Sequence, residues 1–147
     1  MTPDAPTPRR HTERAQPESF RAVSLQASLT VRDLTKSVAW YRDVIGFIID
    51  KEHERDGRLF AVALKAGAVR ILVNQDDGGK GLDRPKGEGF SLMLTTTQSV
   101  DEVAKRIKAA GYALATEPTD MPWGARAFRV QDPDGFKLAI SSERASS

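Results

Sequence analysis

Few side chains in this sequence could do chemistry on their own. The 147-residue chain has no cysteine and two histidines, His11 and His53. The absence of cysteine excludes disulfides, thiolate nucleophiles and cysteine-ligated metals. His11 lies in a polar, proline-rich segment, and His53 lies in a run of charged residues without a partner of metal-ligand spacing. We therefore predict that His53 is an exposed strand residue and not a metal ligand.

A second group of chemically capable residues lies in the segment 74–88, which holds four glycines, one proline and a run of charges. Asp76 and Asp77 stand close in sequence to Lys80, Arg84 and Lys86. These side chains could form a polar rim for a ligand, or they could be solvated charges of a mobile loop. The glycine content favours the loop, because loop charges need no partner.

Composition excludes several classes of protein. Hydrophobic residues make up 39% of the chain and charged residues 29%, which is typical of one globular domain. A net charge of +2 is too small to predict nucleic-acid binding, and no apolar run approaches the ~18 residues of a membrane helix. Residues 1–22 are polar and rich in proline, and they are predicted to be a disordered tail. No apolar stretch follows Arg9-Arg10, so we expect a cytoplasmic protein.

Hydrophobic periodicity predicts the elements that position these residues. In the first half, alternation predicts a strand at 25–31 and strands at 47–54, 58–65 and 68–73, with a helix at 33–45 that Gly46 ends. In the second half, a strand is predicted at 89–96 and a helix at 98–110, where Ser99 and Glu102 form a capping box. A short strand at 112–116, a loop at 118–124 and a hairpin around Asp132-Pro-Asp-Gly135 complete the chain.

The two halves repeat one pattern. Phe60 lies seven residues before Gly67, as Phe128 lies seven residues before Gly135, and an alternating strand follows each glycine. The sequence thus predicts an α+β domain at 23–143 made of two tandem βαβββ modules, with sheets that curl around a cleft. The modules are expected at about 24–74 and 88–142, joined by a linker at 75–87.

Four motifs carry a resemblance to a known family. They are Ser28-Leu-Thr-Val-Arg-Asp-Leu34, Ser37-Val-Ala-Trp-Tyr-Arg-Asp-Val-Ile-Gly-Phe47, Pro122-Trp-Gly-Ala-Arg126 and Asp132-Pro-Asp-Gly-Phe-Lys137. Together they resemble the glyoxalase/bleomycin-resistance/extradiol-dioxygenase group, the vicinal oxygen chelate superfamily, over roughly residues 24–142. The resemblance implies the paired-module fold and leaves the reaction open, because one fold hosts many functions.

The resemblance also implies where metal-dependent members would carry their ligands. Those positions fall on the first and fourth strands of each module, and here they are Gln26, Ile71, Phe90 and Ala139. One is a neutral amide and three are hydrocarbon, whereas a Zn²⁺, Mn²⁺ or Fe²⁺ site needs three or four N, O or S donors. The sequence therefore predicts no metal, no cofactor, and a cleft lined by these four residues.

The loop at 122–126 is similar to one that helps line the cleft in the bleomycin-resistance branch. Trp123 offers a flat face for a planar ligand and Arg126 could meet an anion, although Trp123 could equally anchor a turn by burial. The leading hypothesis is a protein that sequesters a small aromatic or peptidic compound, as in antibiotic resistance. The alternatives are a divergent lyase, isomerase or epimerase, and a dimeric regulatory module. By analogy with the family, a homodimer is expected in each case.

Overall fold

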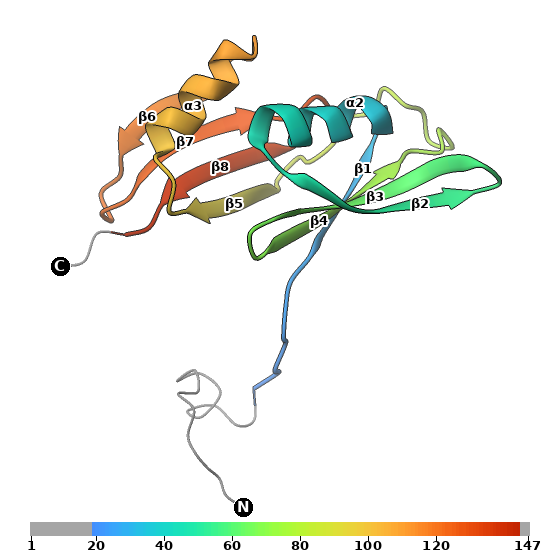
Figure 1. The fold of residues 1–147 in the computed structure, drawn as a ribbon, viewed down its shortest axis with the longest axis horizontal. Coiled ribbons are helices and arrows are strands. Elements are labelled where there is room, and N and C mark those ends of the chain that lie inside the picture. The colour runs from blue at the N-terminus through green and yellow to red at the C-terminus, as the bar shows by residue number, and fades with distance from the viewer. Residues whose placement is uncertain (1–18, 145–147) are drawn as a thin grey trace, which may run out of the picture.

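The computed structural model describes residues 19–144 and divides them into two βαβββ modules (Figure 1). The first module contains β1 (Ala27–Val31), α2 (Leu34–Ala39), the π-helix η1 (Trp40–Ile45), β2 (Ile48–Arg55), β3 (Arg58–Ala66) and β4 (Val69–Gln75). The second contains β5 (Ser91–Thr96), α3 (Val100–Ala109), β6 (Thr116–Asp120), β7 (Arg126–Gln131) and β8 (Lys137–Ser142). The predicted α+β fold of two tandem modules is confirmed.

Each module forms one four-stranded mixed sheet. The strand orders are β1-β4-β3-β2 and β5-β8-β7-β6, so the two sheets have the same topology. In each, the first strand runs parallel to the last, and the remaining pairs are antiparallel. The shared topology explains the sequence repeat, because equivalent turn glycines connect equivalent strands.

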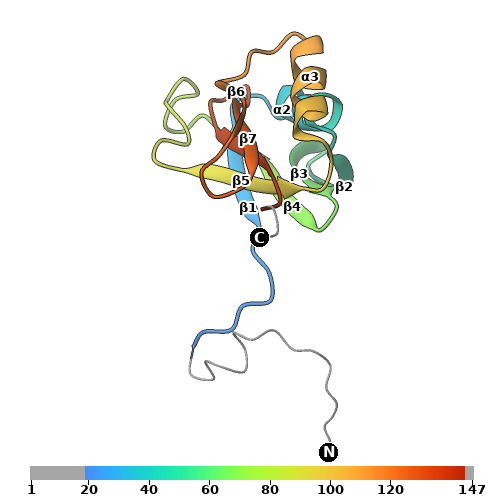
Figure 2. The same cartoon turned by 90° about the vertical axis from the view of Figure 1, so that its left-hand side faces the viewer.

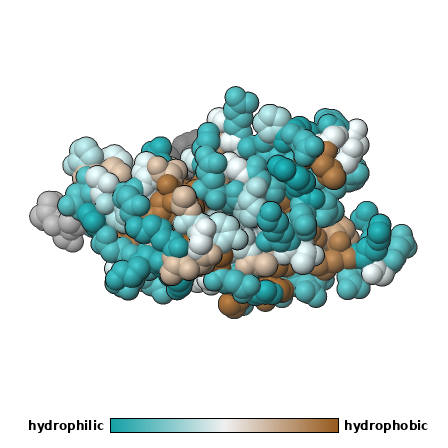
Figure 3. All heavy atoms as spheres, turned by 90° about the horizontal axis from the view of Figure 1, so that it is seen from above, coloured by the Kyte–Doolittle hydropathy of each residue, from teal (hydrophilic) through white to brown (hydrophobic). Residues whose placement is uncertain are grey.

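The helices cover one face of both sheets (Figures 1 and 2). Alternating strand residues point to this face, where they meet the apolar stripes of the helices. The core runs through both modules and includes Leu29, Trp40, Tyr41, Val73, Ile107, Phe128 and Leu138. Seen from the helix side, the molecule is mostly hydrophilic, with hydrophobic residues in scattered patches (Figure 3). Within residues 19–144, no helix lies on the opposite face of either sheet.

The helix of the first module begins as an α-helix, as expected, and continues as a π-helix. Asp33 caps α2 by accepting a hydrogen bond from the backbone N–H of Lys36, 3.2 Å away. From Trp40 onward the chain winds as a π-helix, and the left-handed Gly46 ends it. Tyr41 lies fully inside the core.

The helix of the second module, α3, has the predicted cap. The Ser99 hydroxyl accepts a hydrogen bond from the backbone N–H of Glu102 at 3.2 Å. Val100, Val103, Ala104 and Ile107 form its buried stripe. Arg106 reaches across to donate a hydrogen bond to the carbonyl of Ile45, which ties α3 to the end of η1.

Two parts of the second half differ from the sequence prediction. The strand expected at 112–116 lies instead at Thr116–Asp120, so that its last three residues fall in the segment 118–124 that was expected to be a loop. It is the outer strand of its sheet, and its pairing with β7 is interrupted between Thr116 and Thr119. Pro118 fits there because an edge strand tolerates a residue that cannot donate a ladder hydrogen bond.

The linker also departs from the expected solvated loop. Asp76 and Lys86 have buried side chains and form an ion pair, and Arg84 reaches the same carboxylate at 3.2 Å. The predicted tail at 1–22 falls mainly outside the described residues, as does His11; residues 19–22 are exposed. Within residues 19–144, no helix is long and apolar enough to cross a membrane.

Candidate ligand-binding site

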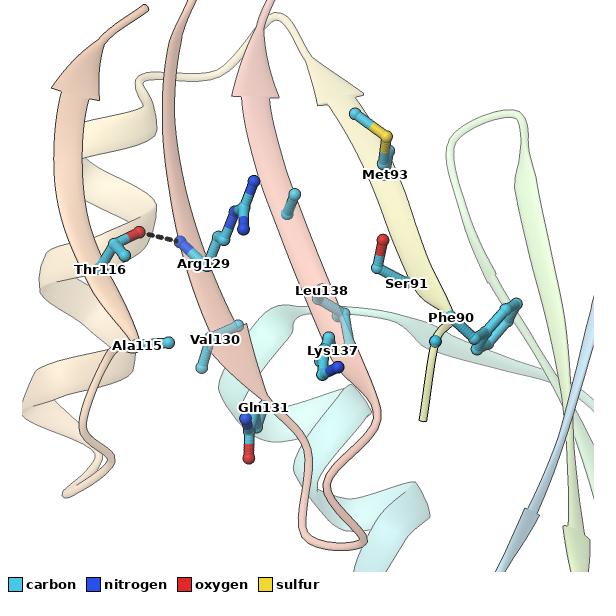
Figure 4. Close-up of a pocket in the computed structure, with 12 residues that line it drawn as sticks. Phe90, Ser91, Met93, Ala115, Thr116, Arg129, Val130, Gln131, Lys137 and Leu138 are labelled. Atoms are coloured by element: carbon cyan, nitrogen blue, oxygen red, sulfur yellow. Dashed lines mark hydrogen bonds between the residues drawn. The ribbon is translucent and has the colours of Figure 1, made fainter. Parts of the chain in front are cut away.

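The helix-free face of the sheet β5-β8-β7-β6 carries a cavity of about 470 Å³ (Figure 4). That volume falls within the range of small-molecule sites. Three adjacent strands and the start of β6 supply its walls. The lining residues are Gly89, Phe90, Ser91, Met93, Ala115, Thr116, Arg129, Val130, Gln131, Lys137, Leu138 and Ala139.

Strand alternation explains which side chains face this cavity. In β7, Phe128 and Val130 are buried beneath the helices, so Arg129 lies on the open side. In β8, Leu138 and Ile140 are buried, so Ala139 lies on the open side. The helices lie behind the strands in the view of the open face (Figure 4).

Register arranges the open-face residues in two rows across the three strands. Ala139 pairs with Met93 on one side and with Arg129 on the other. The second row, one step along the strands, places Lys137 between Ser91 and Gln131. Because the Ala139 side chain is small, it leaves a hollow between the Met93 thioether and the Arg129 guanidinium.

The apolar side of the cavity is formed from β5 and the residue before it. Met93 is 77% exposed and Phe90 is 44% exposed, although both are large apolar side chains. The Phe90 ring meets Phe136 edge to face, with 6.4 Å between the ring centroids. This contact supports Phe90 from below and leaves its outer surface free for a ligand.

The structure brings two of the four positions expected for the cleft into this cavity. Phe90 and Ala139 line it, as described. Gln26 is exposed and lies one residue before β1, in the other module. Ile71 is 2% exposed and belongs to the core.

The placement of Ile71 differs from the expectation that it faces a cleft. It pairs with Leu64, which is also buried under the helices, whereas its neighbour Leu72 pairs with Ala63 on the open face. The expected register of β4 is thus displaced by one residue. A shift of one residue moves a strand side chain to the opposite face of its sheet.

Arg126 is engaged away from the cavity. Its guanidinium donates to both carboxylate oxygens of Asp101 on α3, at 2.9 and 3.0 Å, and to Asp120 at 3.1 Å. Hydrogen bonds to these two carboxylates raise the pKa of Arg126 above its ordinary value, and the Arg126 hydrogen bond lowers the pKa of Asp101. The residue therefore ties β7 to α3 and β6.

Trp123 lies in the turn between β6 and β7 and is 51% exposed. Its backbone carbonyl accepts a hydrogen bond from Nε of Arg144 at 3.1 Å. The indole is neither a buried turn anchor nor a residue that lines the cavity. Burial as a turn anchor does not fit this exposure, and contact of Trp123 with a ligand stays a prediction.

Sequence analysis did not single out Met93, Arg129 or Lys137, which line the cavity. Alternation within β7 and β8 places Arg129 and Lys137 opposite the buried residues, so the pattern contained a signal for their face. That signal does not show whether a side chain faces open solvent or a cavity, because the polar residues of a strand can face either one. The pairing of β5 with β8 decided that these residues surround a hollow.

The donor set does not fit the metal that the fold family implies. Among residues 19–144, no group of three or more His, Cys, Asp or Glu side chains is placed to hold an ion. His53 lies in β2 opposite Ala61, and its ring centroid is 6.1 Å from that of Phe60. A lone imidazole and the exposed amide of Gln26 do not supply the donors that a divalent transition metal requires.

Comparison with known proteins places the chain among relatives of this fold. Residues 23–140 match the Glyoxalase/Bleomycin resistance protein/Dioxygenase superfamily. A bleomycin resistance protein of Geobacillus stearothermophilus is 33% identical over 125 residues, which cover 77% of this chain and 91% of that protein.

A catechol-2,3-dioxygenase of Bacillus subtilis is 31% identical over 113 residues; these cover 71% of this chain and only 35% of the dioxygenase. Among solved structures, TioX from Micromonospora sp. ML1 has a TM-score of 0.68 at 22% identity, covering 82% of this chain and 98% of that chain. The likeness to TioX concerns the fold alone.

Proposed function

Because the chain belongs to the glyoxalase/bleomycin resistance protein/dioxygenase superfamily, we propose that it binds a small aromatic or peptidic molecule without a catalytic metal. The observation that carries this proposal is the cavity of about 470 Å³ on the open face of β5-β8-β7-β6. Phe90 and Met93 leave apolar surface exposed there, and Ala139 forms a floor with room above it. An apolar pocket with a few placed polar groups is typical of small-molecule sites.

The proposal includes a homodimer that completes the cleft. Both sheets present a helix-free face, and β1 and β5 each leave one edge without a strand partner in the described chain. In a dimer, the open face of β1-β4-β3-β2 from one protomer would stand opposite the cavity of its partner. The Leu72 and Ala63 side chains would then contribute apolar surface to the same ligand.

Binding is favoured over metal catalysis by the chemistry of the available donors. The positions expected to hold a metal carry an amide, a phenylalanine and an alanine, and on β4 the buried Ile71 gives way to Leu72 on the open face. Hydrocarbon at these positions suits an apolar ligand and leaves a Lewis acid without anchors. The bleomycin resistance proteins among the relatives supply a precedent for ligand binding in the family.

The test is titration calorimetry at pH 7 with metal-free bleomycin and with naphthalene probes. We expect at least one probe to bind wild-type protein, and Ala139→Trp to weaken that binding by about tenfold or more, because an indole fills the hollow. Ala113→Trp is the matched control, since Ala113 is exposed and does not line the cavity. Thermal unfolding verifies that both variants are folded.

Two results would contradict the proposal. One is the failure of every probe to bind, or equal binding by Ala139→Trp. The other is stoichiometric divalent-metal binding together with turnover of the hemithioacetal of methylglyoxal and glutathione that EDTA abolishes. The second result would instead favour a divergent lyase, the activity for which a Vibrio cholerae relative, 28% identical, is named.

A further inference from the structure

The cavity on the open face of the second sheet is positively charged. Its lining contains two cations, Arg129 and Lys137, and no acidic residue. We infer that the ligand of this site carries an anionic group, such as a carboxylate or a phosphate, attached to a flat apolar body. This inference rests on the proposed function, and it specifies the chemical class of the ligand.

Neither of these two cations has a carboxylate partner. Within residues 19–144, several other arginines and lysines form ion pairs, as Arg126 does with Asp101 and Arg70 with Asp50. No carboxylate lies within ion-pair distance of Arg129 or Lys137 in the same part of the chain. Two like charges on one concave surface repel each other, and an anionic ligand would relieve that repulsion.

A nearby acid is held away from the cavity. Glu117 follows the lining residue Thr116, and it is the closest carboxylate to it in sequence. Its side chain pairs instead with Lys108 on α3, at 2.8 Å. The Thr116 hydroxyl accepts a hydrogen bond from the backbone N–H of Arg129 at 3.0 Å, which fixes the start of β6 beside Arg129.

The two cations lie close enough together to bind one anion. Arg129 faces Ala139, and Lys137 stands two residues before Ala139 on the same strand, so the two cations are diagonal neighbours. Such neighbours are about 7–8 Å apart at Cα, within reach of two long side chains that converge on one anion. The Ser91 hydroxyl lies beside Lys137 in the same row and adds a neutral donor.

The polar and apolar walls of the cavity lie on opposite sides of Ala139. Met93 and Phe90 lie on the β5 side, whereas Arg129 lies on the far side of Ala139 (Figure 4). A planar ring placed on the β5 side would lie over Ala139, and a carboxylate on the ring would point to Arg129 and Lys137. An arginine is suited to this task because its planar fork matches a carboxylate.

Charge on the other sheet agrees with this arrangement. On the open face of β1-β4-β3-β2, Lys65 and Arg70 share the carboxylate of Asp50. The Lys65 ammonium lies 3.6 Å from it, and the Arg70 guanidinium donates a hydrogen bond to it. Lys51 pairs with Ala63 on the same face and has no carboxylate partner within the described chain. A second copy that closed the cleft with this face would add to its positive charge.

The experiment compares three isosteric probes by titration calorimetry at pH 7 and low salt: naphthalene-2-carboxylate, 2-naphthamide and 2-naphthylmethylammonium. We expect the carboxylate to bind about tenfold more tightly than the amide, which corresponds to one charge-assisted contact, and the ammonium to bind most weakly. Raising the salt concentration to about 0.3 M should reduce the preference for the carboxylate, since salt screens exposed charges.

Variants assign the preference to the two side chains. Arg129→Gln and Lys137→Gln should each lower the affinity for the carboxylate several-fold and leave the amide unaffected. Lys80→Gln removes the same charge from an exposed linker residue outside the cavity, and it should leave all three affinities unchanged. All three positions are exposed, so these substitutions preserve folding.

The outcomes separate this inference from the proposed function. Equal affinities for carboxylate and amide, or a preference for the ammonium, would overturn the anionic ligand class, while Ala139→Trp would still weaken the binding of the probes. The same holds if Lys80→Gln reduces carboxylate binding as much as the two cavity variants. Absence of binding by all probes would overturn the proposed function itself.

Discussion

The Tyr41 hydroxyl and the Asp132 carboxylate form a buried hydrogen bond of 2.8 Å between the two modules. Asp132 also accepts backbone N–H groups of Asp134 and Phe136, both at 2.9 Å, and so shapes the turn before β8. Burial raises the pKa of Asp132, and burial together with Asp132 raises the pKa of Tyr41 far above its usual range. Tyr41 therefore stays protonated and remains a donor.

We predict that Tyr41→Phe lowers the free energy of unfolding by about 1–3 kcal/mol at pH 7, because a buried carboxylate loses a donor. Because the pKa of Asp132 is raised in the folded state, the folded protein binds this proton more readily than the unfolded chain does. The charged carboxylate therefore destabilises the fold at pH values above the folded pKa, and the protonated form below that pKa does not. The penalty should thus shrink as pH falls towards about 4, as urea unfolding at both pH values would reveal.

Tyr112→Phe is the control for this substitution. Tyr112 is 39% exposed, and no hydrogen bond involves its hydroxyl within the described chain. Its ring meets Trp40 edge to face, a contact that phenylalanine preserves. A loss of stability equal to that of Tyr41→Phe, or a penalty independent of pH, would contradict the role assigned to the Tyr41 hydroxyl.

At the scale of elements, an ion pair closes the linker on itself, and Gly87 packs the linker against the second module. Asp76 follows β4, and its carboxylate accepts the Lys86 ammonium group and the backbone N–H of Gly78 at 2.9 Å. These hydrogen bonds lower the pKa of Asp76 to about 2, and the one from Lys86 has the largest effect. Next to Lys86, the backbone of Gly87 lies directly on Phe136.

We predict that Gly87→Ala is more destabilising than Gly81→Ala. Both glycines have positive φ, +75° and +89°, so each substitution has a similar backbone cost of about 1–2 kcal/mol. A Cβ at Gly87 would stand 2.7 Å from Cδ1 of Phe136, whereas a Cβ at Gly81 meets nothing within 4 Å. Overpacking should therefore add about 1–3 kcal/mol at Gly87 only, measurable by urea unfolding. Equal costs would mean that the linker moves away from Phe136 freely.

At the scale of the whole molecule, two sheets stand side by side under one helical layer (Figures 1 and 2). The layer supplies one continuous core, but each sheet keeps a face without helices. Half of a ligand cleft lies on each of these faces if the chain pairs with a second copy, as we propose.

We predict that the protein in solution has about twice the 16.1 kDa mass of one chain. Light scattering coupled to size exclusion measures this mass, and dilution should lower it only at concentrations below the dissociation constant. A monomer at all concentrations that still binds its probe would show that one sheet is sufficient for the site, and would contradict the proposed shared cleft.

Much of this architecture could be predicted from local sequence. Gly46, Ser99 and Asp132-Pro-Asp-Gly135 act through their own backbone conformation and close neighbours, so the ends of helices and the last hairpin were predictable. The repeat of turn glycines and alternating strands determined two equivalent modules. Phe90 and Ala139 both line the cavity, and their contact with a ligand stays a prediction. The face of Ala139 was predictable because the turn anchors the register of its hairpin.

Tertiary structure alone decided the composition of the site. The face of Ile71 depends on how β4 pairs with β1 and β3, and a single residue of register reverses it. Arg126 donates hydrogen bonds to Asp101 and Asp120 because the tertiary structure places α3 and β6 beside β7. Long-range strand pairing likewise brings Met93, Lys137 and Arg129 around one alanine. Alternation within a strand shows which residues share a face; only pairing between distant strands shows what that face meets.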